Sequence, residues 1–147
     1  MDNLIRVIAR DGSVMCCAVD STKIAGEAER IHKTSATVTA ALGRLLTAGA
    51  MMGSMLKNPE DSVTLRLSGG GPAGKFTVVA DGAGMVKGDV ENPIVEIPLN
   101  NYGKLDVAGA VGKDGSESEA AEVAFHNSDI ITNIRTVSEG NKLNVTW

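Results

Sequence analysis

The stretch TSATVTAALGRLLTAGAMMGSMLK, residues 34–57, decides how this sequence folds. Thr34-Ser35 can cap a helix, and the spacing predicts a helix from Ala36 to about Lys57. Arg44 is the single charge inside it, and small or apolar residues occupy every side. A helix that is apolar all round is normally buried all round. We therefore expect a central helix that other layers of the fold cover.

The residues before this helix predict a hairpin and a short helix. Residues 4–9 alternate, Asp11-Gly12 is a strong hairpin turn signal, and residues 14–19 are β-prone. Ser21-Thr22 can then cap a helix that runs to about His32. Its apolar stripe would consist of Ile24, Ala28 and Ile31.

The residues after the central helix predict strands. Alternating segments at 63–67, 76–80 and 94–99 are separated by the turns GGGP at 69–72 and Asp81-Gly82. An acidic helix near 117–122 and a last hairpin made of 130–137 and 143–147 would follow, and that hairpin could pair with the main sheet. The pattern predicts one α+β domain over residues 1–147, with antiparallel β layers packed on a central buried helix, a β/α/β arrangement.

Composition excludes several partners and cofactors. The net charge is −4 and the basic residues are scattered, which argues against nucleic-acid binding. The first residues lack the uninterrupted apolar run of a secretory signal, so a cytoplasmic protein is expected. The two cysteines, Cys16 and Cys17, are adjacent and would point to opposite faces of a strand. Together with the distant His32 and His126 they do not make a zinc site.

Two motifs suggest chemistry that their context argues against. GGGPAGK at 69–75 fits most of a phosphate-binding loop, but Phe76 replaces the required hydroxyl and a strand follows where a helix should begin. Replacing Lys75 should therefore change little. Residues 36–56 could span a bilayer, but Arg44 near the centre makes this costly, so we expect a buried helix of a soluble protein. Arg44 would then be buried and would need a carboxylate or carbonyl partner.

Catalysis is not indicated by the remaining reactive residues. Neither histidine and neither cysteine has a recognisable partner nearby in the sequence that would make it a base or a nucleophile. We predict a protein that is not an enzyme, with no catalytic residues, no bound metal and no cofactor.

Three long motifs are similar to one family. Residues 34–57, LSGGGPAGKFTVVADGAGMVKGDVENP at 67–93 and GKLDVAGAVGKDGS at 103–116 resemble heat shock protein 33, the 33 kDa chaperonin family of redox-regulated chaperones. The resemblance covers about residues 1–116 in continuous order. Residues 117–147 do not match, so they are expected to close the core with an unrelated segment.

The resemblance implies an ATP-independent holdase of the stress response, which captures unfolding proteins through apolar surface and dimerises when active. It also implies a β/α/β core and a C-terminal switch of four zinc-binding cysteines. Cys16 and Cys17 match those ligands in neither position nor spacing, so we predict neither zinc nor redox dependence in this chain. The alternatives are an inert remnant or a dimerising module, and, more remotely, a nucleotide-binding protein.

The methionine-bearing end of the central helix is the predicted client-binding site. The four candidates are Met51, Met52, Met55 and Leu56. Met51 and Met55 share a helix face while Met52 points about 100° away, so at least one should belong to the core. Flexible thioether side chains suit a surface that adapts to many partners. The alternative is that the hairpin at 130–147 covers this surface, with Trp147 as an apolar plug.

Overall fold

The computed structural model describes residues 2–112, with their side chains, and the backbone of residues 120–126, 135–139 and 142–146. Its helices are α1 (Thr22–His32), α2 (Ala36–Gly53) and α3 (Val107–Val111). Its strands are β1 (Asn3–Ile8), β2 (Met15–Asp20), β3 (Ser62–Ser68), β4 (Lys75–Asp81), β5 (Val86–Val90), β6 (Ala120–His126), β7 (Arg135–Glu139) and β8 (Lys142–Thr146).

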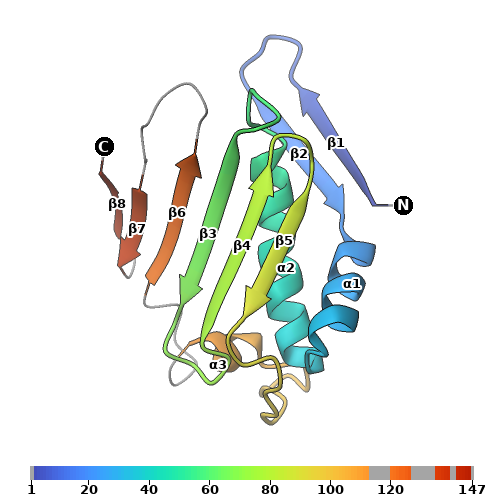
Figure 1. Cartoon of the computed structure of the whole chain (residues 1–147), viewed down its shortest axis with the longest axis vertical. Coiled ribbons are helices and arrows are strands. Elements are labelled where there is room, and N and C mark those ends of the chain that lie inside the picture. The colour runs from blue at the N-terminus through green and yellow to red at the C-terminus, as the bar shows by residue number, and fades with distance from the viewer. Residues whose placement is uncertain (1, 113–119, 127–134, 140–141, 147) are drawn as a thin grey trace.

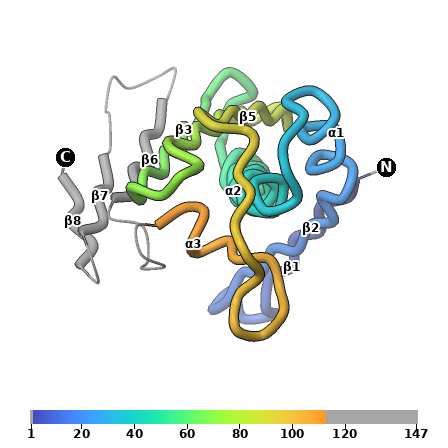
Figure 2. The backbone as a smooth tube through the Cα atoms, turned by 90° about the horizontal axis from the view of Figure 1, so that it is seen from below, coloured from blue at the N-terminus to red at the C-terminus, as the bar shows by residue number. Residues whose placement is uncertain are grey.

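The strands form two separate antiparallel sheets. One has six strands in the order β5-β4-β3-β6-β7-β8, and the other is the β1–β2 hairpin alone (Figure 1). Seen along its axis, α2 lies between the large sheet and the hairpin, with α1 at its side (Figure 2). The expected β/α/β layering is thus confirmed, although the second β layer holds two strands.

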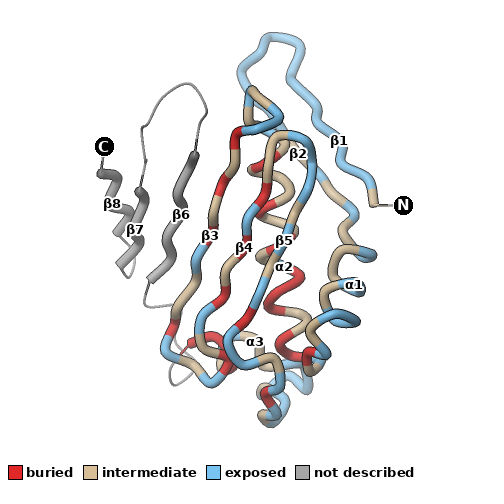
Figure 3. The backbone as a smooth tube through the Cα atoms, in the orientation of Figure 1, coloured by how far each residue is buried: buried red, intermediate tan, exposed pale blue. Residues whose placement is uncertain are grey.

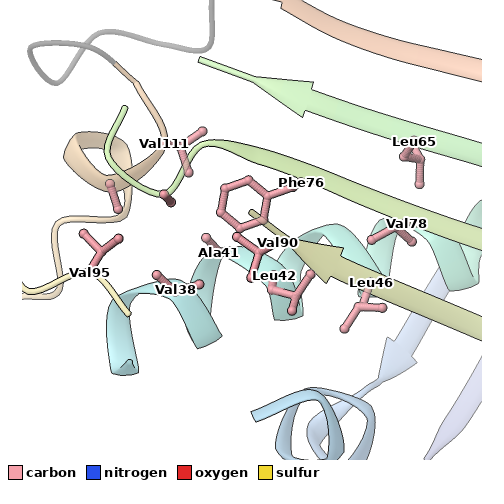
Figure 4. Packing of buried hydrophobic residues seen from close by; sticks show 12 residues of the cluster. Val38, Ala41, Leu42, Leu46, Leu65, Phe76, Val78, Val90, Val95 and Val111 are labelled. Atoms are coloured by element: carbon pink, nitrogen blue, oxygen red, sulfur yellow. The ribbon is translucent and has the colours of Figure 1, made fainter. Parts of the chain in front are cut away.

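The core lies between α2 and the large sheet. Phe76 and Val78 of β4 are fully buried against Leu42 and Leu46 of α2 (Figure 4). Gly49 lets the helix come this close, because a Cβ there would lie 2.6 Å from Val78 Cγ1. The sequence of α2 therefore fixes both its burial and its distance from the sheet.

The predicted end of α2 was four residues too late. The helix ends at Gly53, where a Cβ would lie 2.8 Å from the Asp81 carbonyl oxygen. Beyond it the chain tightens into i→i+3 turns, since Met55 N–H donates to Met52 and Leu56 N–H donates to Gly53. Met55 and Leu56 consequently lie on a turn and not on the helix.

The strand predicted over 94–99 is wrong. This segment is irregular, and Val95 is fixed by Ser35, whose hydroxyl donates to Val95 O at 2.9 Å and accepts from Val95 N at 3.1 Å. The side chain of Ser35 was expected to cap α2, but it makes no capping hydrogen bond. The sheet uses β5 instead, and Gly88 in β5 leaves room for Leu46.

The acidic helix predicted near 117–122 is also wrong over the residues that the structure describes. Residues 120–126 form β6, which pairs with β3. The last hairpin is confirmed as β7 and β8, and β6 joins it to the main sheet. Residues 117–119, 130–134 and 147, which belong to the same predictions, lie outside the described residues.

The start of α1 is capped by residues other than the one expected. Ser21 Oγ bonds to Thr47 Oγ1 and caps nothing. The Asp2 carboxylate accepts the N–H groups of Lys23 and Ile24, at 3.0 and 2.7 Å. The Thr22 hydroxyl donates to Asp20 and holds the pKa of that carboxyl below its ordinary value. Acidic groups thus occupy the helix N-terminus, where the dipole favours them.

Candidate functional site

The four predicted client-binding residues lie together at the end of α2. Met55 is the most exposed, with 47% of its surface accessible, and Met51 and Leu56 are half-buried. Met52 packs against the core, as expected of at least one of the methionines. The surface that these residues offer by themselves is therefore small.

The neighbouring β1–β2 hairpin exposes much more apolar surface. None of the residues of β1 and β2 is buried, and Figure 3 shows β1 pale blue, as exposed, and β2 partly tan, as intermediate. Its accessible large apolar side chains are Leu4, Ile5, Val7, Ile8, Val14 and Met15, which are between 37% and 64% exposed.

These side chains cover both faces of the hairpin. The register pairs Ile5 with Ala18 and Ile8 with Met15. Because side chains alternate along a strand, Ile5 and Val7 lie on one face while Leu4 and Ile8 lie on the other. A strand that is apolar on both faces is typical of a sheet covered on both sides. Here no residue on either face is buried, although Cys17 and Val19, on the face with Leu4 and Ile8, are half-buried.

The hairpin and the end of α2 form one continuous surface. The Arg6 guanidinium donates to the carbonyl and to the hydroxyl of Ser54, the residue that follows α2. This contact holds the Leu4–Ile8 face next to the turn that carries Met55. We call the exposed apolar residues of the hairpin, together with Met51, Met55 and Leu56, the hairpin surface.

Sequence reasoning missed the hairpin half of this surface. It treated residues 4–9 as a simple alternation, although Leu4-Ile5 and Val7-Ile8 are apolar pairs. Adjacent apolar residues in a strand place apolar groups on both faces. That pairing is the signal that could have identified the surface.

The two cysteines lie on opposite faces of β2, as expected. Cys16 is exposed and Cys17 is half-buried. His32 of α1 faces Asp89 of β5, with 3.6 Å between Nδ1 and Oδ1. The side chain of His126 lies outside the described residues. Among the described side chains, no three histidine, cysteine or acidic groups gather where they could hold a metal ion.

The prediction for Arg44 is wrong, because its side chain is exposed. It lies on an open face of α2, between two grooves. One, of about 560 Å³, lies toward α1, and the other, of about 640 Å³, lies toward residues 99–108. An exposed guanidinium is hydrated, so it needs no protein partner. None of the described helices is long and apolar enough to cross a membrane.

The glycine-rich turn between β3 and β4 packs against α3. Gly71 N–H donates to Val111 O, Ala73 N–H donates to Ala110 O, and Lys75 N–H donates to the Glu91 carboxylate, all at 3.0 Å. A phosphate-binding loop must keep such N–H groups free. Here they are used within the fold, and a strand follows the turn.

Comparison with known proteins agrees with the sequence motifs. Residues 2–118 match the Hsp33 protein family. The chain is 48% identical over 115 residues to the 33 kDa chaperonin of Clostridium tetani and 49% identical over 114 residues to that of a Geobacillus species. These alignments cover 78% of this chain but only 39% and 38% of the relatives.

The fold is similar to that of a solved relative. The crystal structure of the 33 kDa chaperonin of Thermotoga maritima superposes with a TM-score of 0.81 at 29% identity, over 92% of this chain and 44% of that one. The chain thus spans less than half the length of these relatives. From the motifs, the layered fold and these similarities, the chain belongs to the Hsp33 family.

Proposed function

We propose that this chain is an ATP-independent holdase that binds unfolding proteins through the hairpin surface. The observation that carries the proposal is the exposure of six large apolar side chains on a two-stranded hairpin. Exposed apolar area of this kind marks interaction sites in soluble proteins. The curated relatives are named 33 kDa chaperonin, which supports a chaperone as the class of protein.

Binding without ATP fits the geometry of the glycine-rich turn. Its N–H groups bond to α3 and to Glu91, so no cradle for phosphate is open. Binding without a zinc switch in this chain fits its two cysteines, which number fewer than the four ligands of a structural zinc site. The proposed partners are unfolded polypeptides in the cytoplasm, with neither nucleic acid nor membrane involved.

The test compares two isoleucines of nearly equal exposure. Ile8 on the hairpin is 64% exposed, and Ile94, in the irregular segment that follows β5, is 66% exposed. Light scattering of a thermally unfolding reporter protein is recorded with each lysine variant, with and without ATP. We expect Ile8→Lys to need about tenfold more protein for the same suppression, because a buried isoleucine contributes 1.5–3 kcal/mol to an apolar contact.

Ile94→Lys should suppress scattering like the unchanged chain. Equal effects of the two substitutions would show that the unfolding protein does not bind specifically at the hairpin surface. No suppression by the unchanged chain would favour the rival interpretation, an inert or dimerising remnant. Suppression of aggregation that requires ATP hydrolysis would contradict the proposed ATP independence.

A further inference from the structure

The hydrogen-bond register of the hairpin leaves one edge of β1 open. Ala9 N–H donates to Val14 O at 2.8 Å, which makes this a hydrogen-bonded pair. Such pairs alternate along an antiparallel ladder, so Val7 and Ile5 also bond to β2. The backbone groups of Leu4, Arg6 and Ile8 therefore point away from β2. Within the described part of the chain, no strand lies beyond β1 to receive them.

This edge lacks the usual protection. Exposed edge strands in soluble proteins are normally short, bent by a bulge, or interrupted by proline or lysine. The six residues of β1 pair without a bulge and include no proline. Their one charge, on Arg6, is directed to Ser54. The edge is thus a free template for another strand.

The side chains beside this edge define what can pair with it. An added strand would place its alternate residues next to Leu4 and Ile8 on one face and next to Ile5 and Val7 on the other. A strand from the surface of a protein alternates apolar and polar residues, so half of its contacts would be polar. A strand from a protein interior is apolar on both faces and would match both.

We propose that the free edge of β1 binds clients by strand addition, taking an extended, continuously apolar segment that was a core strand before the client unfolded. This inference rests on the proposed function and specifies its binding mode. Main-chain hydrogen bonds would supply affinity that does not depend on sequence, and the apolar neighbours would select interior strands. The same edge would discriminate against folded proteins, whose core strands are already paired.

The probes are blocked, lysine-flanked peptides with a valine–leucine run. In one, alternate residues are N-methylated, which leaves a single pairing edge and prevents self-association. In the other, every residue of the run is N-methylated, so the side chains are kept and the donors are lost. Fluorescence anisotropy on the full chain should show binding of the first peptide and at least about tenfold weaker binding of the second, because strand addition requires free N–H groups. Equal binding of both would overturn the proposal.

The matched variants are Ile8→Pro and Ile8→Ala. Both shorten the side chain, but only proline removes the outward N–H, and it spares the bonds to β2. Ile8→Ala loses only the side-chain contact, so strand addition predicts that Ile8→Pro binds the peptide at least about tenfold more weakly than Ile8→Ala does. Circular dichroism shows whether each variant folds. If Ile8→Pro does not fold, Leu4→Pro, whose N–H also points outward, replaces it in the same test.

Two further outcomes distinguish client binding at this edge from client binding elsewhere and from self-association of the chain. If Ile8→Pro loses peptide binding but still suppresses aggregation fully, clients do not use this edge, and the proposal fails while the holdase function stands. If the unchanged chain sediments as a dimer that Ile8→Pro dissociates, the edge binds a second copy of this chain, and the client as occupant is excluded.

Discussion

Strands β4 and β1 resemble one another in composition but differ completely in burial. On β4, Phe76, Val78 and Ala80 face α2 and are at most 2% exposed, while Val79 on the opposite face is 37% exposed. On β1, no residue is buried. The difference is set by what covers each strand, because α2 packs on the large sheet, whereas no described element buries a residue of β1. Apolar residues on a strand can therefore serve stability or binding, and their neighbours decide which.

The comparison predicts that the large sheet determines stability and that the hairpin determines binding. Burial of apolar area is the main favourable term in folding, so substitutions in the large sheet should change the free energy of unfolding. Substitutions on the hairpin should change binding with little effect on that free energy. Two pairs of variants and one single variant test this difference, in order of decreasing effect on stability.

The largest effect is expected for Phe76→Ala. The ring is fully buried, and its loss should lower the free energy of unfolding by about 3–5 kcal/mol. Val79→Ala, on the outer face of the same strand, is the control and should cost less than about 1 kcal/mol. Urea denaturation measures both. Similar losses in the free energy of unfolding for the two variants would show that the outer face of β4 is buried as much as the inner face.

An intermediate effect is expected at the contact of α2 with the sheet. In Gly49→Ala, the new Cβ would meet Val78 Cγ1 at 2.6 Å, and overpacking costs about 1–3 kcal/mol. The better helix propensity of alanine offsets about 1 kcal/mol of this. Gly26→Ala in α1 meets no atom within 4 Å and should gain about 0.5–1 kcal/mol. Opposite shifts in thermal midpoint are the expected result, and two shifts of the same sign would contradict it.

The smallest effect on stability is expected for Ile5→Ser. Ile5 is 63% exposed, so it should cost less than about 1 kcal/mol in the free energy of unfolding. Suppression of aggregation should nevertheless weaken severalfold, because an apolar contact is lost from the proposed surface. A variant that loses stability like Phe76→Ala would show that the hairpin belongs to the core.

The elements that local signals define were predictable from the sequence. Asp11-Gly12 placed the first hairpin, since Gly12 takes a φ of +73°, which favours glycine. The apolar pattern of α2 predicted a helix between two β layers. These predictions depended on backbone conformations and periodicities that neighbouring residues fix by themselves.

Elements that depend on distant contacts were not predictable. Residues 94–99 alternate like a strand, but Val95 bonds to Ser35 at the start of α2. Residues 120–126 include three alanines, which favour helix, yet they pair with β3. Arg44 was placed in the interior because its helix looked uniformly apolar, although that helix has one open face. The candidate site was half predicted, since the methionines were named and the hairpin residues were not.

The way in which the hairpin is attached has a consequence for amide hydrogen exchange. Asp2 holds it to α1 and Arg6 holds it to Ser54, both through polar contacts. Segments with few buried apolar contacts open without global unfolding. The amides of Ile5 and Val7, although hydrogen-bonded, should therefore exchange through detachment of the hairpin as a unit, long before those of Val78. Their shared rate would report how often the molecule exposes the inner face of the hairpin to solvent.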